Sequence, residues 1–140
     1  MTAKEYLKQY ELAENRVRIL RSAYEKEKAQ IDLITSPLGS DGMPHGSAIS
    51  NTVESRAIRL IESAEKLIDA EYEAIRIEQE VLSVILKVPG EKGVVLYERY
   101  INLKRWEDVA DSMHYTLRHI HRLHQDALQI VQDVIVCHFL

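Results

Sequence analysis

The chain has 140 residues, enough for one ordinary domain or for a small domain with an extension. Its formal net charge of −4 excludes a protein that coats nucleic acid generally, because such domains are strongly basic. The single cysteine excludes an internal disulfide, and there is neither a signal peptide nor an apolar run of roughly 20 residues, so we expect a cytoplasmic protein with no membrane partner.

Residues 2–34 have the pattern of one long helix and contain neither Gly nor Pro. Seam residues recur at steps of four and three from Tyr6 to Ile34, and only Glu27 interrupts their apolar character. A lone helix cannot bury such a seam, so the pattern predicts a partner helix.

Residues 35–50 contain prolines and glycines at short intervals, which predicts a loop. Two interpretations of Met43-Pro44-His45-Gly46 in this loop stay open. It is either part of a mobile linker or a segment that docks on a partner.

A second long helix is predicted from Asn51 to about Val88, with Glu54 completing a capping box at its start. Its apolar stripe is wider than a two-stranded coiled coil requires. We expect one side to pack on the first helix as an antiparallel hairpin and the other to form a homodimer or homotetramer. The predicted oligomer-interface residues are Leu60, Ile61, Leu67, Ile68, Ile75 and Leu82.

Pro89-Gly90 marks the predicted boundary between an oligomerising hairpin, residues 1–88, and a C-terminal domain, residues 89–140. This domain begins with a helix predicted from Glu91 or Lys92 to about Asn102. The residues of this helix predicted to face inward are Leu96, Tyr97, Tyr100 and Ile101.

Two further amphipathic helices are separated only by His114-Tyr115-Thr116, which is too short for anything but a tight turn. Thr116 can cap the second of them, and the order of short helix, turn and longer helix is that of a helix-turn-helix. The second helix is apolar beyond what a three-helix core uses, so we expect its end to pack on the hairpin or on another chain. The predicted buried residues are Trp106, Val109, Ala110 and Met113 in the first helix, and Leu117, Ile120, Leu123, Ala127, Leu128, Val131, Val134 and Ile135 in the second.

The opposite face of the second helix is polar and has the character of a DNA-recognition surface. No acidic residue occurs from His114 to Gln125, although the whole chain is acidic. Arg side chains suit guanine edges and phosphates, and Gln suits adenine. The predicted base contacts are Arg118, His121, Arg122 and Gln125, and the predicted backbone contacts are Lys104, Arg105 and Thr116.

The stretch from Arg105 to Leu128 resembles, without a gap, region 4 of the sigma-70 family of bacterial initiation factors. Trp106-Glu107-Asp108-Val109-Ala110 stands where that module has Leu-Glu-Glu-Ile-Gly/Ala, and Ala127-Leu128 stands for its closing Ala-Leu. The run Leu96-Tyr97-Glu98-Arg99-Tyr100-Ile101 and the run Arg122-Leu123-His124 look like small transcription regulators of Gram-positive phages and prophages. These are late-gene activators and autolysin-regulator-type proteins. The resemblance implies regulation of phage or prophage genes in a bacterial host.

Two positions depart from the region 4 pattern. His114 stands where the module usually has Gly, the residue used where φ is positive. Leu117-Arg118 stands where sigma factors have Arg-Glu to read promoter DNA. The resemblance therefore implies the scaffold and not the DNA sequence that it reads.

No catalytic or cofactor-binding arrangement is recognisable, so we expect a protein that is not an enzyme and has no cofactor. Four histidines lie close together at His114, His119, His121 and His124. His119 and His121 point to different helix faces and no cysteine lies near them, so we expect no metal site.

The sequence thus predicts an all-α protein that binds double-stranded DNA as a homo-oligomer and regulates transcription. Two alternatives stay open. The domain could dock on RNA polymerase without reading DNA independently, or the chain could be a phage DNA-packaging or assembly subunit whose helix-turn-helix is a structural element.

Overall fold

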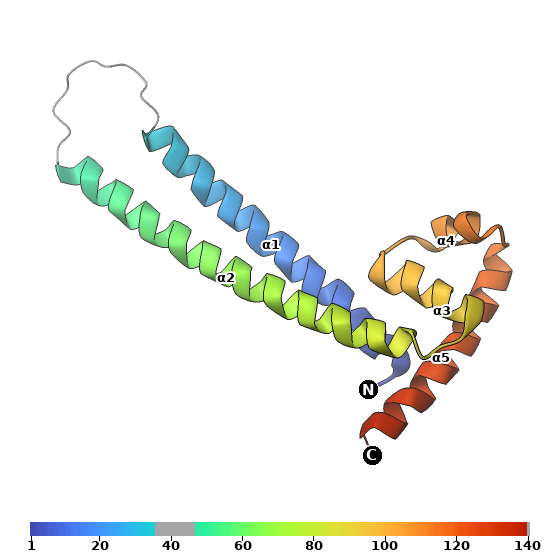
Figure 1. Ribbon diagram of the computed structural model, residues 1–140. Helices are drawn as coiled ribbons and strands as arrows, with labels where there is room; N and C mark the ends of the chain where they lie inside the picture. Colours follow the sequence, from blue (N-terminus) through green and yellow to red (C-terminus); the bar gives the residue numbers. More distant parts are fainter. Residues whose placement is uncertain (36–46, 140) are drawn as a thin grey trace. The chain divides into compact units, whose positions relative to one another are not determined.

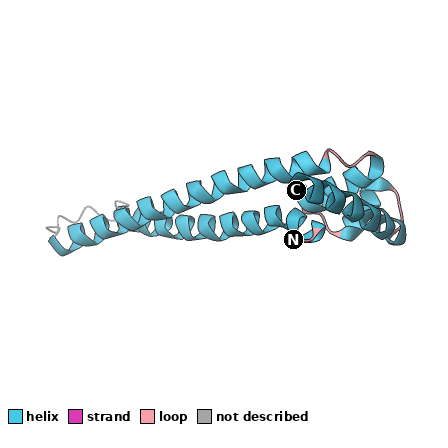
Figure 2. Cartoon of the chain, turned by 90° about the horizontal axis from the view of Figure 1, so that it is seen from below, coloured by secondary structure: helices cyan, strands magenta, loops and turns pink. Residues whose placement is uncertain are grey.

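The computed structural model describes residues 1–35 and 47–139, and every regular element in these ranges is a helix (Figures 1 and 2). The predicted all-α class is confirmed: two long N-terminal helices precede shorter ones. Within residues 1–35 and 47–139, no helix contains an apolar stretch of membrane-spanning length. The elements are α1 (Ala3–Thr35), α2 (Ser47–Ile85), α3 (Gly90–Leu96), the π-helix η1 (Tyr97–Ile101), α4 (Trp106–Met113) and α5 (Leu117–Phe139).

The ends of α2 differ from the prediction. The helix begins at Ser47, so Asn51 and Glu54 lie inside it and the predicted capping box at its start is wrong. No Gly or Pro separates Ser47 from Asn51, so nothing interrupts the helix there. The predicted docking segment, residues 43–46, lies outside the described residues, and both interpretations of it stay open.

The described chain forms two compact units, and the division differs from the predicted boundary at Pro89. The first unit combines residues 1–14 with the chain from Glu73 onward, and the second contains residues 15–72. The first unit therefore holds the start of α1 and the last turns of α2 together with all the shorter helices. Assignment of oligomerisation to one part and DNA binding to the other stays a prediction.

In the second unit, α1 and α2 pack as an antiparallel pair. Val17 of α1 and Leu67 of α2 are buried. Arg21 forms an ion pair with Glu71 at 2.8 Å, and the Arg56 guanidinium donates to the side-chain oxygen of Gln30. Going along α1 from Arg21 to Gln30, the partner on α2 moves back from Glu71 to Arg56, as the predicted antiparallel hairpin requires.

In the first unit, the start of α1 and the end of α2 supply the surface that covers the far end of α5. The overhang of α5 beyond a three-helix core therefore packs on the long helices, as predicted. The hydroxyl of Tyr6 donates to the Glu80 carbonyl at 3.5 Å, which ties α1 to α2 at this level. We call the buried set here the base cluster: Ala3, Tyr6, Leu7, Tyr10, Val81, Val84, Ile85, Val88, Leu96, Tyr100, Ile101, Ala127, Val131 and Ile135.

The junction between α2 and α3 is closely packed at Gly93. A Cβ atom on Gly93 would lie 2.5 Å from the Val88 carbonyl oxygen, so a larger residue would push the two helices apart. Val88 itself is buried although α2 ends at Ile85. One closing turn carries the chain there, with the Val88 N–H donating to the Ile85 carbonyl at 2.9 Å.

The helix predicted from residue 91 or 92 to about 102 changes type after Leu96. From Tyr97 it is a π-helix, in which the Asn102 N–H donates to the Tyr97 carbonyl five residues back at 3.1 Å. The wider turn shifts which residues share a face. Leu96, Tyr100 and Ile101 face inward as predicted, but Tyr97 is 39 % exposed and its predicted burial is wrong.

Candidate nucleic-acid interface

The turn between α4 and α5 has the geometry of a helix C-cap closed by a left-handed residue. His114 has φ 58° and ψ 38°, in the region that Gly enters most easily. The Tyr115 N–H donates to the Ala110 carbonyl at 3.0 Å, and the His114 N–H donates to the Asp111 carbonyl at 3.3 Å. The sequence departure at His114 therefore falls on a position with positive φ.

Thr116 starts α5 in the way the sequence predicts. Its hydroxyl accepts the His119 N–H at 3.2 Å, and its carbonyl accepts the Ile120 N–H at 3.0 Å. The cap satisfies one of the backbone N–H groups left free at a helix start. The cap uses the hydroxyl oxygen only as an acceptor, so the O–H of Thr116 can still donate to a phosphate.

The inner faces of α3, α4 and α5 meet in a second core, which we call the turn cluster: Val95, Val109, Ala110 and Ile120, with Trp106, Met113, Tyr115 and Leu123 packed around them. Val95, Val109 and Ile120 are completely buried. Both α3 and α4 pack against α5 (Figure 1). Leu117 is 40 % exposed, so the buried face of α5 starts at Ile120 and the predicted burial of Leu117 is wrong.

The four predicted base-contact residues lie on the face of α5 opposite the turn cluster. Arg118, His121, Arg122 and Gln125 are all exposed, and we call them the outer face. Among the described residues, no ion pair or hydrogen bond engages the side chains of Arg118, Arg122 and Gln125. These three side chains can therefore reach an external ligand without first breaking an internal contact.

The predicted backbone contacts Lys104 and Arg105 lie just before α4, and each already has an acidic neighbour. The Lys104 ammonium lies 2.5 Å from a carboxylate oxygen of Glu98, which is only 18 % exposed. Arg105 pairs with Asp108 at 3.3 Å, and both side chains are well exposed. Exposed pairs contribute little free energy, so Arg105 can exchange Asp108 for a phosphate more easily than Lys104 can leave Glu98.

The predicted oligomer-interface residues divide between two faces of α2. Leu67 is buried at 9 % exposure, and Leu60 and Leu82 are half-buried. Leu67 therefore packs inward within the chain and leaves little surface for a partner, and its place in an oligomer interface stays a prediction. Ile61, Ile68 and Ile75 are 59 %, 56 % and 57 % exposed, at the seven-residue spacing of a helix-pairing stripe.

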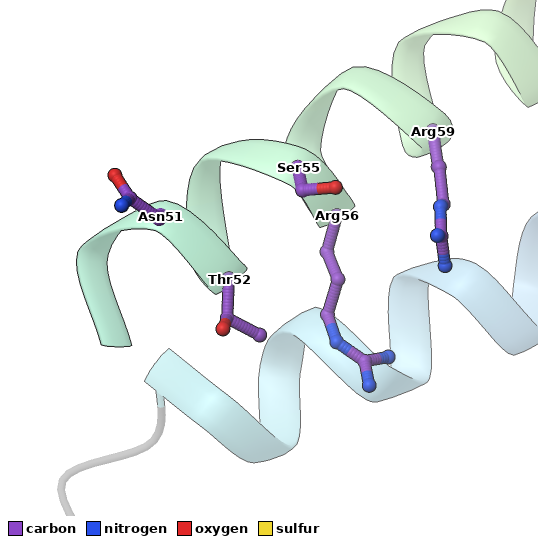
Figure 3. Close-up of a pocket in the computed structure, with 5 residues that line it drawn as sticks. All are labelled: Asn51, Thr52, Ser55, Arg56 and Arg59. Carbon is purple, nitrogen blue, oxygen red and sulfur yellow. The ribbon is translucent and has the colours of Figure 1, made fainter. Parts of the chain in front are cut away.

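A polar hollow of about 350 Å³ lies along the first turns of α2 (Figure 3). Arg56 and Arg59 both point toward α1 there, and Arg56 is held by Gln30. It is lined by Asn51, Thr52, Ser55, Arg56 and Arg59. None of the predicted site residues lies in it.

A buried polar pair next to the outer face was missed in the sequence. His124 is only 4 % exposed, and its Nε2 lies 2.7 Å from the Tyr100 hydroxyl. Spacing could have found it, because His124 follows Ile120 by four residues and precedes Ala127 by three on the buried face. Within residues 1–35 and 47–139, no three side chains among His, Cys, Asp and Glu converge as metal ligands do.

Burial sets the protonation states of this pair. It lowers the pKa of His124 to about 4, and the positive charges of Lys4, His121 and Arg99 act in the same direction. Burial likewise raises the pKa of Tyr100 to about 12. At neutral pH the imidazole is therefore uncharged and the phenol keeps its proton, so the Tyr100 O–H can donate to Nε2.

No protein-family model, curated protein or solved structure matches this chain. The assignment of the outer face as a DNA-binding site therefore depends on the geometry and charge of α5.

The left-handed turn predicts opposite effects for two substitutions at His114. His114→Gly should leave the free energy of unfolding unchanged or raise it by up to about 1 kcal/mol, because relief of backbone strain exceeds or balances the entropy that Gly adds to the unfolded chain. His114→Val should lower it by at least about 1 kcal/mol, because a β-branched residue resists positive φ. Urea denaturation measures both, and a Val variant as stable as the wild type would contradict this turn geometry.

The neutral, buried His124 predicts a pH-dependent stability. The folded pKa of about 4 lies below the ordinary value of 6.5, so the unfolded chain takes up a proton that the folded chain rejects between these values. The free energy of unfolding should therefore fall as the pH drops from 6.5 toward 4. Urea denaturation across that range should show a shallower fall for His124→Gln, which keeps a polar side chain but cannot titrate. Equal slopes for the two proteins would refute the assignment.

Proposed function

We propose that this chain is a transcription regulator that reads double-stranded DNA with the outer face of α5 and acts as a homo-oligomer. The observation that carries the proposal is the combination of exposure and charge on α5. Its outer face is free of internal contacts at three of four positions, and no acidic residue occurs from His114 to Gln125. The resemblance to phage regulators supports phage or prophage genes as the targets.

The chemistry of the outer face fits the edges of base pairs in the major groove. A guanidinium fork can donate to O6 and N7 of guanine, and the Gln125 amide can both donate to and accept from adenine. In a helix-turn-helix, the second helix enters the major groove with its first turns toward the bases. Arg118, His121 and Arg122 lie in the first two turns of α5.

The small number of basic residues around the helix-turn-helix argues for more than one copy on DNA. Phosphate contacts supply much of the affinity, and each contact adds one small, salt-dependent increment. Lys104 and Arg105 lie just before α4, and both have acidic neighbours. Two or more copies would multiply the contacts, and the exposed Ile61, Ile68 and Ile75 support self-association through α2.

One observation supports docking on a partner protein as a second candidate function, and the resemblance to region 4 suggests RNA polymerase as that partner. An apolar groove of about 320 Å³ lies between the end of α2 and the start of the shorter helices. Leu86, Val94 and Tyr97 line it and are all exposed. Capture of purified RNA polymerase by a protein that shifts no DNA would favour this function over direct reading.

Selection from a random duplex library at near-physiological salt tests the proposed function, and Arg122 variants sharpen it. If Arg122 reads a guanine, Arg122→Ala should lose about 1–3 kcal/mol of the binding free energy that distinguishes the correct base at one base pair of the recovered sequence. Arg122→Lys should lose the same base preference, because an ammonium group cannot donate two parallel hydrogen bonds as a guanidinium does. It should keep its affinity for DNA of any sequence, because the positive charge remains.

Arg18→Ala, an exposed arginine on α1, serves as the control and should change neither preference nor affinity. Unchanged binding of Arg122→Ala to the recovered duplex would remove Arg122 from the site. Failure of the wild type to recover any sequence would refute direct reading.

If the chain self-associates through α2, charged residues on the exposed isoleucine stripe of α2 should lower the mass of the oligomer in solution. The double variant Ile61→Lys/Ile68→Lys should sediment as a smaller species than the wild type, because burial of two ammonium groups in an apolar interface is costly. Leu33→Lys replaces another exposed apolar residue, on α1, and it should leave the mass unchanged. Sedimentation equilibrium makes the comparison, and a monomeric wild type would contradict the oligomer.

A further inference from the structure

Trp106, the only tryptophan of the chain, connects the outer face of α5 to the buried core. It is the first residue of α4 and is half-buried at the edge of the turn cluster. Its ring lies 5.1 Å from the ring of His121, 4.5 Å from the ring of His124 and 4.9 Å from the guanidinium carbon of Arg99, measured to ring centroids. Three side chains from two other helices therefore contact one indole.

Two of these three contacts are themselves fixed in place. Arg99 donates from Nη1 to the Lys104 carbonyl at 2.8 Å, which ties the π-helix to the segment before α4. His124 is buried and shares a hydrogen bond with Tyr100. The indole therefore contacts a tethered guanidinium and a tethered imidazole. It forms a rigid platform beside α5.

The third contact, His121, is the outer-face residue that differs from the others. Arg118, Arg122 and Gln125 have no internal side-chain partner among the described residues, whereas the His121 ring rests on the indole at an interplanar angle of 56°. An aromatic contact of this kind restricts rotation of an otherwise exposed ring. A side chain that is already oriented loses less entropy on binding and discriminates more sharply between ligands.

We propose that Trp106 is a positioning residue that presents His121 in one orientation on the outer face, so that His121 reads a single base pair. The inference rests on the proposed function, and it adds to that function a residue outside the predicted contact set. Arg99 and His124 are the supports of Trp106 in this arrangement.

The platform can be tested first in the free protein, where DNA plays no part. The imidazole resonances of His121 should move when Trp106→Leu removes the ring, because the indole ring current acts on protons at this distance. Trp106→Phe keeps a smaller ring and should move them less. Unchanged His121 resonances in both folded variants would overturn the platform.

The reading role is tested on the recovered duplex, by measuring binding to a set of single base-pair changes. His121→Ala should reduce discrimination at one base pair by about fivefold or more. Trp106→Leu should reduce discrimination at that same base pair, and the double variant should lose no more than either single variant. Trp106→Phe, as the variant least disturbing to the fold, should keep part of the preference.

Met113→Ala is the matched control, because Met113 packs in the same cluster. If Trp106→Leu and Met113→Ala both weaken binding equally for every base-pair change, the role of Trp106 is purely structural and the proposal is overturned. Additive effects of Trp106→Leu and His121→Ala at different base pairs would overturn it as well. If the wild-type protein recovers no DNA sequence, both the proposed function and the reading role of His121 are refuted. The His121 resonances would still show, in that case, whether Trp106 orients the His121 ring in the free protein.

Discussion

Burial of one face of α5 is the constraint on which the rest of the structure depends. Ile120, near the start of α5, is buried in the turn cluster. Ala127 and Val131, further along the helix, are buried in the base cluster. A helix that is fixed at both places cannot rotate about its axis without exposing apolar surface to water. Arg118 and Arg122 must therefore face outward, whatever they bind.

The same constraint explains why the first unit includes parts of the long helices. A three-helix core uses only the first turns of α5, and the remaining apolar face needs cover. Leu7 from α1 and Val81 from α2 supply it, and both are completely buried. The far end of α5 is therefore covered within the first unit itself, by residues 1–14 and the part of α2 from Glu73 onward.

Sequence periodicity predicted the class, the turn and the outer face, and it failed where local geometry departs from a regular α-helix. Thr116 was recognisable as a cap and His114 as a residue at a glycine position, because both depend on neighbours in sequence. Tyr97 was misplaced because a π-turn shifts the register, and no residue type announces that turn. His124 has the spacing of the buried face but was not assigned to the core, because a polar ring is buried only with a hydrogen-bond partner, and Tyr100 lies 24 residues away in the sequence.

Methylation interference on the recovered duplex tests the central claim most directly, because it reports which groove the protein occupies. Guanine N7 lies in the major groove and adenine N3 lies in the minor groove. Reading by the outer face of α5 predicts that N7 methylation at specific guanines abolishes binding, and that N3 methylation is tolerated at the same base steps. Interference confined to adenine N3, or found at no guanine, would contradict the assignment of α5 as the helix that reads DNA.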